Sequence, residues 1–220
     1  MPERVFLASR NPKKIEEMRR ILGEVLESGG SGIEVLGLDD VPAYDEPVEN
    51  QPTFEGNALL KAWAGVRATG LPSLADDSGL CVDALNAMPG VLSARWAGLA
   101  KDDLANNRLL LEQLADVPDE RRGAVFRAVV AFVHPTGGSA GDWAGDGAIA
   151  EHVVHGEMPG RIIREMRGDG GFGYDVVFVP DEQDGGLTSA EMTAEEKDLI
   201  SHRGRSLRAI APVVADWLRT

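Results

Sequence analysis

Two adjacent carboxylates, Asp76 and Asp77, are the residues of this chain best suited to acid–base or metal chemistry. They follow a short apolar run and precede Ser78 and Gly79, so we expect a strand that ends in a Ser-Gly turn. Consecutive strand side chains point to opposite faces, so one Asp can face a ligand while the other anchors the turn. Mg²⁺ typically takes one or two protein carboxylates and leaves its other positions to water and substrate phosphates. A plain solvated turn would have the same composition.

A second polar group surrounds the expected start of the first helix, directly after the apolar strand 5–8. Its residues are Ser9, Arg10, Asn11, Pro12, Lys13 and Lys14. The free N–H groups and the positive dipole end of a helix N-terminus favour a phosphate at such a place. The segment lacks the glycines and the Gly-Lys-Ser/Thr ending of a P-loop, and solvated lysines at a helix start are a common alternative.

Two later segments are suited to binding a flat base. Gly168–Asp175 contains four glycines, which allow close backbone approach, and the ring of Phe172, which offers a stacking surface. Farther along, Lys197 precedes Ser201–Arg203, where one helix ends and Ser201 can cap the next. The planar guanidinium of Arg203 suits a phosphate or a base carbonyl. Alone, the first segment fits a plain glycine-rich loop equally well. In the second, His202 fits a structural histidine, which is the commoner role of a single histidine.

Composition narrows the class of protein. The net charge of -14 over 220 residues argues against binding a nucleic-acid polymer, which needs a basic surface, but it does not exclude small anions. No apolar run approaches the roughly 18 residues of a membrane span. The single cysteine, Cys81, fits a reducing compartment and lies in an apolar run, which favours a core residue. We therefore expect a soluble, cytoplasmic protein.

The apolar periodicity predicts alternating strands and helices. Strands are expected at 5–8, 33–38, 125–134, 147–155 and 176–179, with the third and fourth paired across the glycine-rich loop 136–146. Helices are expected from Pro12, at 53–69, at 104–114, after the Thr193/Glu196 capping box and at the C-terminus. Pro212 should kink or break the last helix. The pattern indicates an α/β protein with a mixed sheet, and residues 1–220 form a single domain because no linker or repeat divides them.

In this order, the segments resemble the inosine/xanthosine triphosphate pyrophosphatases, which remove non-canonical purine nucleotides from the nucleotide pool. The matching residues are Ser9, Asn11, Lys14, Phe54, Asn57, Ala58, Lys61, Ala62, Ala75–Leu80, Pro89–Val91, Ser93–Arg95, Gly171–Asp175 and Ser201–Arg203. The resemblance covers essentially the whole chain. It implies an elongated, two-lobed α/β fold with a twisted central mixed sheet, a nucleotide cleft between the lobes, and a homodimer.

The resemblance also implies a reaction and the residues that perform it. The reaction is Mg²⁺-dependent hydrolysis of ITP, dITP or XTP to the monophosphate and pyrophosphate. Asp77 would bind the metal and orient or deprotonate the water, and the second metal ligand would be Glu49, with Glu46 as a competitor. The substrate-binding residues would be Ser9 to Lys14 for the triphosphate, Ser78, and for the base and the rest of the nucleotide Phe172, Gly173, Tyr174, Asp175, Lys197, His202 and Arg203.

Two other functions fit parts of the pattern. A hydrolase of modified pyrimidine or methylated nucleotides is disfavoured by the Ser-His-Arg segment after Lys197. A nucleotide sensor is disfavoured by Asp77 and Lys14, because a sensor needs no water-activating site. The sequence leaves open the preference among ITP, dITP and XTP, the number of metal ions and the way guanine is rejected.

Overall fold

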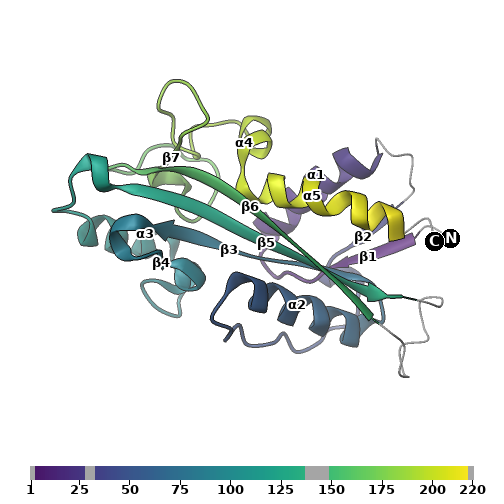
Figure 1. Ribbon diagram of the computed structural model, residues 1–220. Helices are drawn as coiled ribbons and strands as arrows, with labels where there is room; N and C mark the ends of the chain where they lie inside the picture. Colours follow the sequence, from purple (N-terminus) through teal and green to yellow (C-terminus); the bar gives the residue numbers. More distant parts are fainter. Residues whose placement is uncertain (1–2, 28–32, 137–148, 218–220) are drawn as a thin grey trace. The chain divides into compact units, whose positions relative to one another are not determined.

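The computed structural model describes residues 3–27, 33–136 and 149–217. Its strands are β1 (Glu3–Leu7), β2 (Ile33–Leu36), β3 (Ser73–Val82), β4 (Met88–Pro89), β5 (Gly123–Pro135), β6 (Ile149–Ile162) and β7 (Phe178–Pro180) (Figure 1). Its helices are α1 (Pro12–Glu27), α2 (Phe54–Thr69), α3 (Asp103–Gln113), α4 (Ala194–Ile200) and α5 (His202–Trp217).

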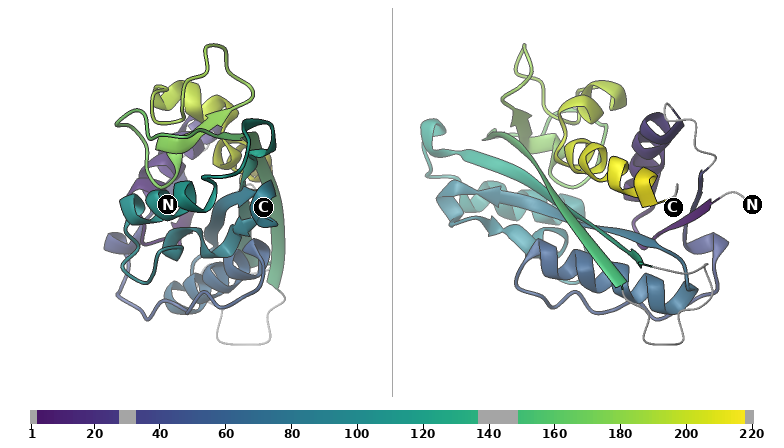
Figure 2. Two further views of the ribbon diagram at one scale, coloured as in Figure 1. Left: turned by 90° about the vertical axis from the view of Figure 1, so that its left-hand side faces the viewer. Right: turned by 45° about the vertical axis from the view of Figure 1, so that its right-hand side comes forward.

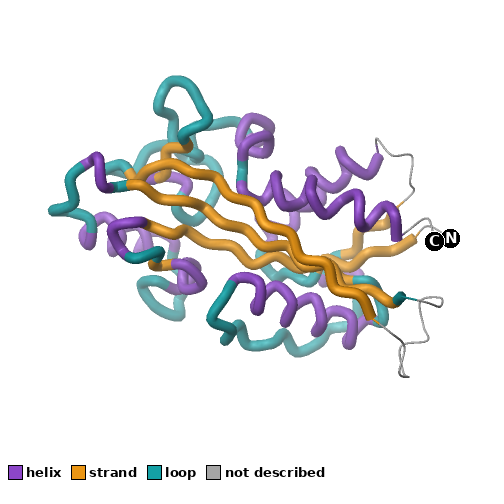
Figure 3. The backbone as a smooth tube through the Cα atoms, viewed as in Figure 1, coloured by secondary structure: helices purple, strands orange, loops and turns teal. Residues whose placement is uncertain are grey.

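The strands form one mixed sheet in the order β2-β1-β3-β5-β6-β7, and β4 pairs with β3. β1 is parallel to both β2 and β3, whereas the β3–β4 and β6–β7 pairs are antiparallel. This confirms the predicted α/β class with a mixed sheet. Figure 3 shows β3, β5 and β6 as long, continuous strands.

The chain divides into two compact units. The first unit comprises Met1–Asp77, Val129–His155 and Ser206–Thr220, and the second comprises Ser78–Ala128 and Gly156–Arg205. In the first unit, α1 and α5 cover one face of the sheet and α2 covers the other (Figure 2). The alternation of β1 explains this arrangement: Val5 and Leu7 pack with α1 and α5, while Phe6 packs with α2.

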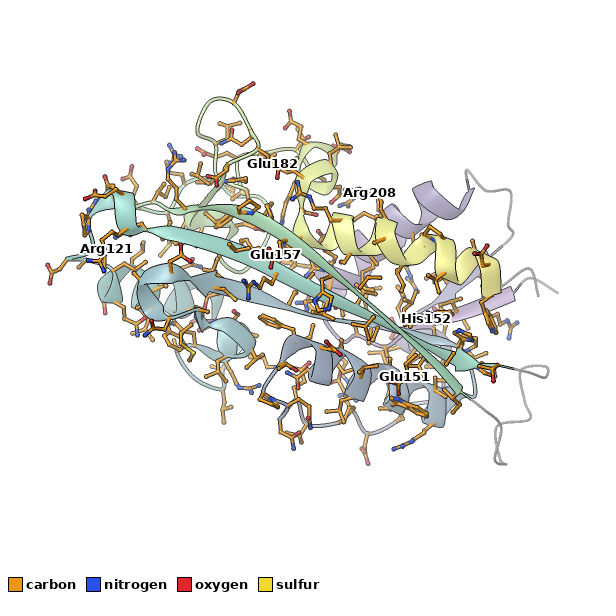
Figure 4. All side chains as sticks on the ribbon, in the orientation of Figure 1. Arg121, Glu151, His152, Glu157, Glu182 and Arg208 are labelled. Carbon is orange, nitrogen blue, oxygen red and sulfur yellow. The ribbon has the colours of Figure 1, made fainter. Side chains whose placement is uncertain are left out.

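The same alternation places polar side chains of β6 on opposite faces of the first unit. Glu151 accepts a hydrogen bond from the indole N–H of Trp63 on α2. The next residue, His152, stacks on His134 of β5, with the ring centroids 5.2 Å apart (both β6 residues are labelled in Figure 4). The alternation of side chains along β6 therefore determines which partner Glu151 and His152 each contact.

The second unit has its own core. Leu80 and Val82 of β3 pack with Leu110 of α3 and with Phe178. Arg122 is buried beside this core, and its guanidinium donates hydrogen bonds to the carbonyls of three residues in the second unit. These are Leu114, Ile162 and Ile163, at 2.6, 2.9 and 3.1 Å. The contacts join the end of α3 to β6.

The expected Ser-Gly turn after Asp77 is wrong, because β3 continues through these residues to Val82. A Cβ added at Gly79 would lie 2.4 Å from both the Gly90 carbonyl oxygen and Ser93 Oγ. Glycine is therefore required for close packing against a segment that lies farther along the chain, and not for a turn.

The expected break at Pro212 is also wrong, because α5 runs unbroken from His202 to Trp217. Pro212 is exposed, while Ile210, Ala211 and Val214 are buried. Packing of these neighbours into the core stabilises the helix across the hydrogen bond that proline cannot make.

The remaining predictions differ from the structure mainly at element ends. The Thr193/Glu196 capping box is present, with hydrogen bonds of 3.2 and 2.9 Å. The strand expected at 176–179 begins only at Phe178, since 175–177 form a 3-10 turn. Most of the loop expected at 136–146 lies outside the described residues. Within the described ranges, no helix combines the length and apolar character that crossing a membrane requires.

Candidate active site

Strand β3 presents Asp76 and Asp77 to helices on opposite faces of the first unit. Asp76 is fully buried and accepts a hydrogen bond from Lys14 Nζ of α1 at 3.0 Å. Asp77 is 7% exposed and accepts one from Asn57 Nδ2 of α2 at 3.0 Å. The predicted division of the pair between two faces is therefore observed, although neither carboxylate lies in a turn.

Lys61 connects Asp77 with the loop before α2. It lies one helical turn after Asn57, and its ammonium is 2.9 Å from Glu49 Oε1 and 3.6 Å from Asp77 Oδ1. Burial lowers the pKa of Lys61, but the charges of Asp77, Asp76 and Glu49 outweigh burial, so its pKa is raised. Lys61 is therefore a permanent cation that holds the Glu49 and Asp77 carboxylates beside it.

The environment of Asp77 favours proton acceptance. Burial raises the pKa of this carboxyl group above its ordinary value, and the opposing effects of Lys61, Lys14 and Asn57 offset only part of that rise. A carboxylate with a raised pKa is a stronger base, which suits a residue that must take a proton from water.

The donor set around Lys61 fits a magnesium ion. Asp77 and Glu49 supply the oxygen ligands that a hard divalent cation prefers, and both flank one ammonium group. Among the described residues, no three or more His, Cys, Asp or Glu side chains gather as a metal-binding group. The protein would thus contribute two carboxylates, which is enough for Mg²⁺, because this ion keeps water and phosphate ligands.

The turn that begins α1 places its residues in different roles. Asn11 Oδ1 accepts the N–H groups of Lys13 and Lys14 at 3.1 and 3.3 Å, so Asn11 caps the helix. Pro12 takes the first helical position, as expected. Ser9 is buried beside this turn at 8% exposure. From this turn, Lys14 contacts the carboxylate pair through its ion pair with Asp76.

Arg10 distinguishes the two candidate acidic ligands. Its guanidinium is 3.2 Å from Glu46 Oε2 and donates a hydrogen bond to the Tyr44 carbonyl at 3.0 Å. Glu46 is therefore paired with Arg10, whereas Glu49 is paired with Lys61 next to Asp77. This geometry favours Glu49 over Glu46 as a metal ligand.

The second unit contains an aromatic ring held by two cations. Lys197 Nζ and Arg203 Cζ lie 5.3 and 5.7 Å from the centroid of the Phe172 ring, within the range of a cation–π interaction. Arg203 is only 2% exposed and donates a hydrogen bond to Ser78 Oγ at 2.8 Å. Four predicted substrate-binding residues are thus brought together.

Asp175 organises the glycine-rich loop around its carboxylate. Its Oδ2 atom accepts hydrogen bonds from Lys197 Nζ at 2.6 Å and from the Phe172 N–H at 2.8 Å. Gly171 has a φ of +68°, and a Cβ there would lie 2.1 Å from the same oxygen. The glycine is required because the chain turns tightly against this carboxylate.

Tyr174 and His202 have side chains packed in the interior of the second unit. The Tyr174 hydroxyl donates a hydrogen bond to the Ser93 carbonyl at 2.9 Å, and burial, with a smaller effect of Asp103, raises its pKa. The His202 ring is 4% exposed and stacks on Phe126, with centroids 4.9 Å apart. These contacts show where the two side chains lie, and their role in binding the substrate stays a prediction.

Sequence reasoning did not assign functional roles to Asn57 and Lys61, which the structure places against Asp77. A signal exists: they lie four residues apart on α2, on the face that also carries the buried Ala58 and Ala62. A buried lysine on a small-residue face needs a carboxylate partner. The sequence does not indicate which carboxylate this is.

The comparisons with known proteins agree over nearly the full length. The Ham1 family matches residues 5–213. A dITP/XTP pyrophosphatase of Nocardia farcinica is 56% identical over 96% of this chain and 95% of its own length. One of Mycobacteroides abscessus is 53% identical over 96% and 94%.

Solved structures show the same relationship. The crystal structure of nucleoside-triphosphatase / dITP/XTP pyrophosphatase from Mycobacterium abscessus has a TM-score of 0.71 and 52% identity, covering 95% of this chain and 99% of that one. The Staphylococcus aureus Ham1 protein has a TM-score of 0.77 at 32% identity, covering 98% and 100%. The predicted resemblance is confirmed, and this chain belongs to the Ham1 family.

Proposed function

We propose that this protein hydrolyses the non-canonical purine nucleotides ITP, dITP and XTP to the monophosphate and pyrophosphate. Its relatives from Nocardia farcinica and Mycobacteroides abscessus are named dITP/XTP pyrophosphatases, which supports the substrate class. The observation that carries the proposal is the cluster of Asp77, Lys61 and Glu49, in which a carboxylate of raised pKa lies beside a buried cation. This is the combination that a hydrolase needs and a nucleotide sensor does not.

The first unit is proposed to bind the triphosphate and activate water. Asp77 would orient the attacking water and take its proton as water reaches the α-phosphorus. Lys14, at the start of α1, would neutralise charge on the departing pyrophosphate, and the capped helix N-terminus beside Ser9 and Asn11 would add N–H donors. Asp77 and Glu49 would hold Mg²⁺, which supplies neutralisation of the phosphate charge when bound.

The second unit is proposed to recognise the base. Phe172 would stack on the purine, and Arg203 would donate to its 6-oxo group. The Phe172 and Gly173 N–H groups are already bonded to Asp175 and Asp103, which favours Arg203 over those two groups. Adenine presents an amino donor at this position, so donor would face donor and a buried hydrogen-bonding group would be left unpaired.

We further propose a cytoplasmic homodimer in which residues 1–220 form one domain. The buried, unpaired thiol of Cys81 fits a reducing compartment. Strands β3, β5 and β6 each contribute residues to both units, which favours one cooperative domain. A single unfolding transition and a dimer mass in sedimentation would support these proposals.

A panel of nucleoside triphosphates tests the reaction. Each is incubated with the protein and Mg²⁺ or with EDTA, and pyrophosphate and orthophosphate are measured separately. We expect pyrophosphate from ITP, dITP and XTP, little from ATP and the pyrimidine triphosphates, and loss of activity with EDTA. Stoichiometric orthophosphate, or equal kcat/KM for ATP and ITP, would contradict the proposal.

A further inference from the structure

Helix α3 has no part in the function described so far, yet it holds both polar groups of one peptide unit in the glycine-rich loop. The Gly173 N–H donates a hydrogen bond to Asp103 Oδ2 at 2.8 Å. The Gly173 carbonyl accepts one from Asn107 Nδ2, also at 2.8 Å. Asp103 and Asn107 are four residues apart, so they lie one above the other on the same face of α3.

Burial of the Asn107 side chain at this position is energetically unfavourable. Asn107 is 2% exposed, and its Nδ2 also donates to the Asp103 carbonyl at 2.8 Å. Its Oδ1 is buried and has no hydrogen-bond partner among the residues that the structure describes. A buried acceptor without a partner is unfavourable, and an apolar side chain would avoid it. The amide is explained by what it does for Gly173, whose carbonyl would otherwise lose this partner.

Asp103 is available for the loop because its neighbour caps the helix. Asp102 Oδ1 accepts the N–H groups of Leu104 and Ala105 at 2.9 and 3.1 Å. The capping role at this helix start is thus filled, and the Asp103 carboxylate reaches Gly173, which is 70 positions away in the sequence.

These contacts complete a series of anchors around the Phe172 ring. The Phe172 N–H is bonded to Asp175, both polar groups of Gly173 are bonded to α3, and the Tyr174 hydroxyl is bonded to Ser93. Gly173 has a φ of +63°, a conformation without strain only for glycine. The backbone that carries the ring is therefore fixed before any ligand arrives.

We propose that Asp103 and Asn107 are positioning residues for base selection: by fixing Gly173, they set the position of the Phe172 ring against which the purine stacks. The inference rests on the proposed function. It assigns α3 a role in discriminating among bases, with no role in binding phosphate or in the hydrolytic step.

The test compares Asn107→Ala with Asn106→Ala. Asn106 is equally buried on the same helix, but its side chain bonds the backbone of Ala94 and Ala97, which lie outside the glycine-rich loop. KM and kcat are measured for ITP and ATP, together with the inhibition constant of inorganic tripolyphosphate, which lacks a base. For Asn107→Ala we expect a KM for ITP about tenfold higher and an ITP/ATP ratio of kcat/KM about tenfold lower, the scale of one hydrogen bond.

Tripolyphosphate inhibition should stay the same in both variants, and Asn106→Ala should keep the ITP/ATP ratio. If Asn107→Ala does not fold, the exposed Asp103 provides the second test. Asp103→Ala should lower the ratio, and Asp103→Asn should restore it, because its amide oxygen still accepts the Gly173 N–H. An unchanged ratio in a folded variant would overturn the inference. A wild-type protein without preference for ITP would instead overturn the proposed function.

Discussion

The two candidate clusters differ in the kinds of group that they bring together. In the first unit, ion pairs join Lys14 to Asp76, and Lys61 to both Asp77 and Glu49. In the second unit, Lys197 and Arg203 both lie over the Phe172 ring, and Lys197 also pairs with the carboxylate of Asp175. Carboxylates suit a metal ion and ammonium groups suit phosphates, whereas an aromatic ring suits a flat base, so the difference supports the proposed division of the nucleotide between the two clusters.

The largest effect is expected from Asp77→Asn. The change keeps the size of the side chain and removes its basicity, so kcat should fall at least ~100-fold for every substrate, the scale of losing a general base. KM ratios among bases should stay the same, because the second cluster is untouched. Near-normal turnover in a folded variant would mean that Asp76 or another acid performs this role.

The same variant should be no less stable than wild type. Burial raises the folded-state pKa of Asp77. The protonated side chain therefore stabilises the fold fully only below the unfolded-state pKa, and this stabilisation is lost as pH rises through the folded-state pKa. At pH 7 the ionised side chain therefore costs stability, and the neutral amide removes that cost. We expect the Tm of Asp77→Asn, measured at pH 7 with EDTA, to equal or exceed that of wild type. A clear fall would show that the charge stabilises the fold.

A smaller effect separates Glu49 from Glu46. Glu49→Gln should raise the Mg²⁺ concentration for half-maximal activity by about tenfold, the scale of losing one charged contact. Glu46→Gln removes a carboxylate paired with Arg10 and serves as the matched control, with a shift below about twofold. The reverse order would assign the metal to Glu46 and contradict the role given to the Lys61 pair.

The smallest effect concerns His134 and His152, which belong to neither cluster. Nδ1 of His134 is 2.7 Å from the Pro135 carbonyl, so it carries the proton, and Nε2 accepts from Nε2–H of His152 at 3.1 Å. Burial lowers the pKa of His134, and His152 lowers it further. The stabilisation that comes from the neutral His134 ring is fully present above the unfolded-state pKa. It is lost as pH falls through the folded-state pKa.

The Tm of wild type should therefore fall more than that of His134→Gln as the pH is lowered from about 6.5, the ordinary pKa of histidine. His155→Gln, at an exposed position of β6, is the control and should behave like wild type. Parallel Tm profiles for wild type and His134→Gln would show that the pair does not contribute to the pH dependence.

Local signals were sufficient to predict some elements from the sequence. Thr53 caps α2 by accepting the Gly56 N–H at 3.1 Å, and Gly70 ends the helix with a φ of +68°. Both residue types are typical of these positions, so the boundaries at 53–69 could be predicted. The family motifs likewise predicted Asp77 and the Phe172 segment as candidates.

The features that could not be predicted depend on contacts between residues far apart in the sequence. The residue type of Gly79 is typical of a turn. Its actual role depends on its close approach to Gly90 and Ser93, which follow it by more than ten positions. The choice between Glu46 and Glu49 depends on Lys61, and the link from Gly173 to α3 depends on chain segments 66 and 70 residues apart. Sequence spacing does not encode such pairings, because each depends on how the sheet and helices pack.

The most direct test of the division between the two clusters is the ITP/ATP ratio of kcat/KM in Lys14→Ala and Arg203→Ala. Arg205→Ala, at a half-buried position of α5 whose guanidinium pairs with Glu182, is the control. Lys14→Ala removes a charge near the phosphates, so both substrates should weaken alike and the ratio should stay the same. Arg203→Ala should lower the ratio roughly ten- to a hundred-fold, because a hydrogen bond from a charged donor contributes about 1.5–3 kcal/mol. A ratio that collapses in Lys14→Ala and persists in a folded Arg203→Ala would contradict this division and reverse the two ends of the nucleotide.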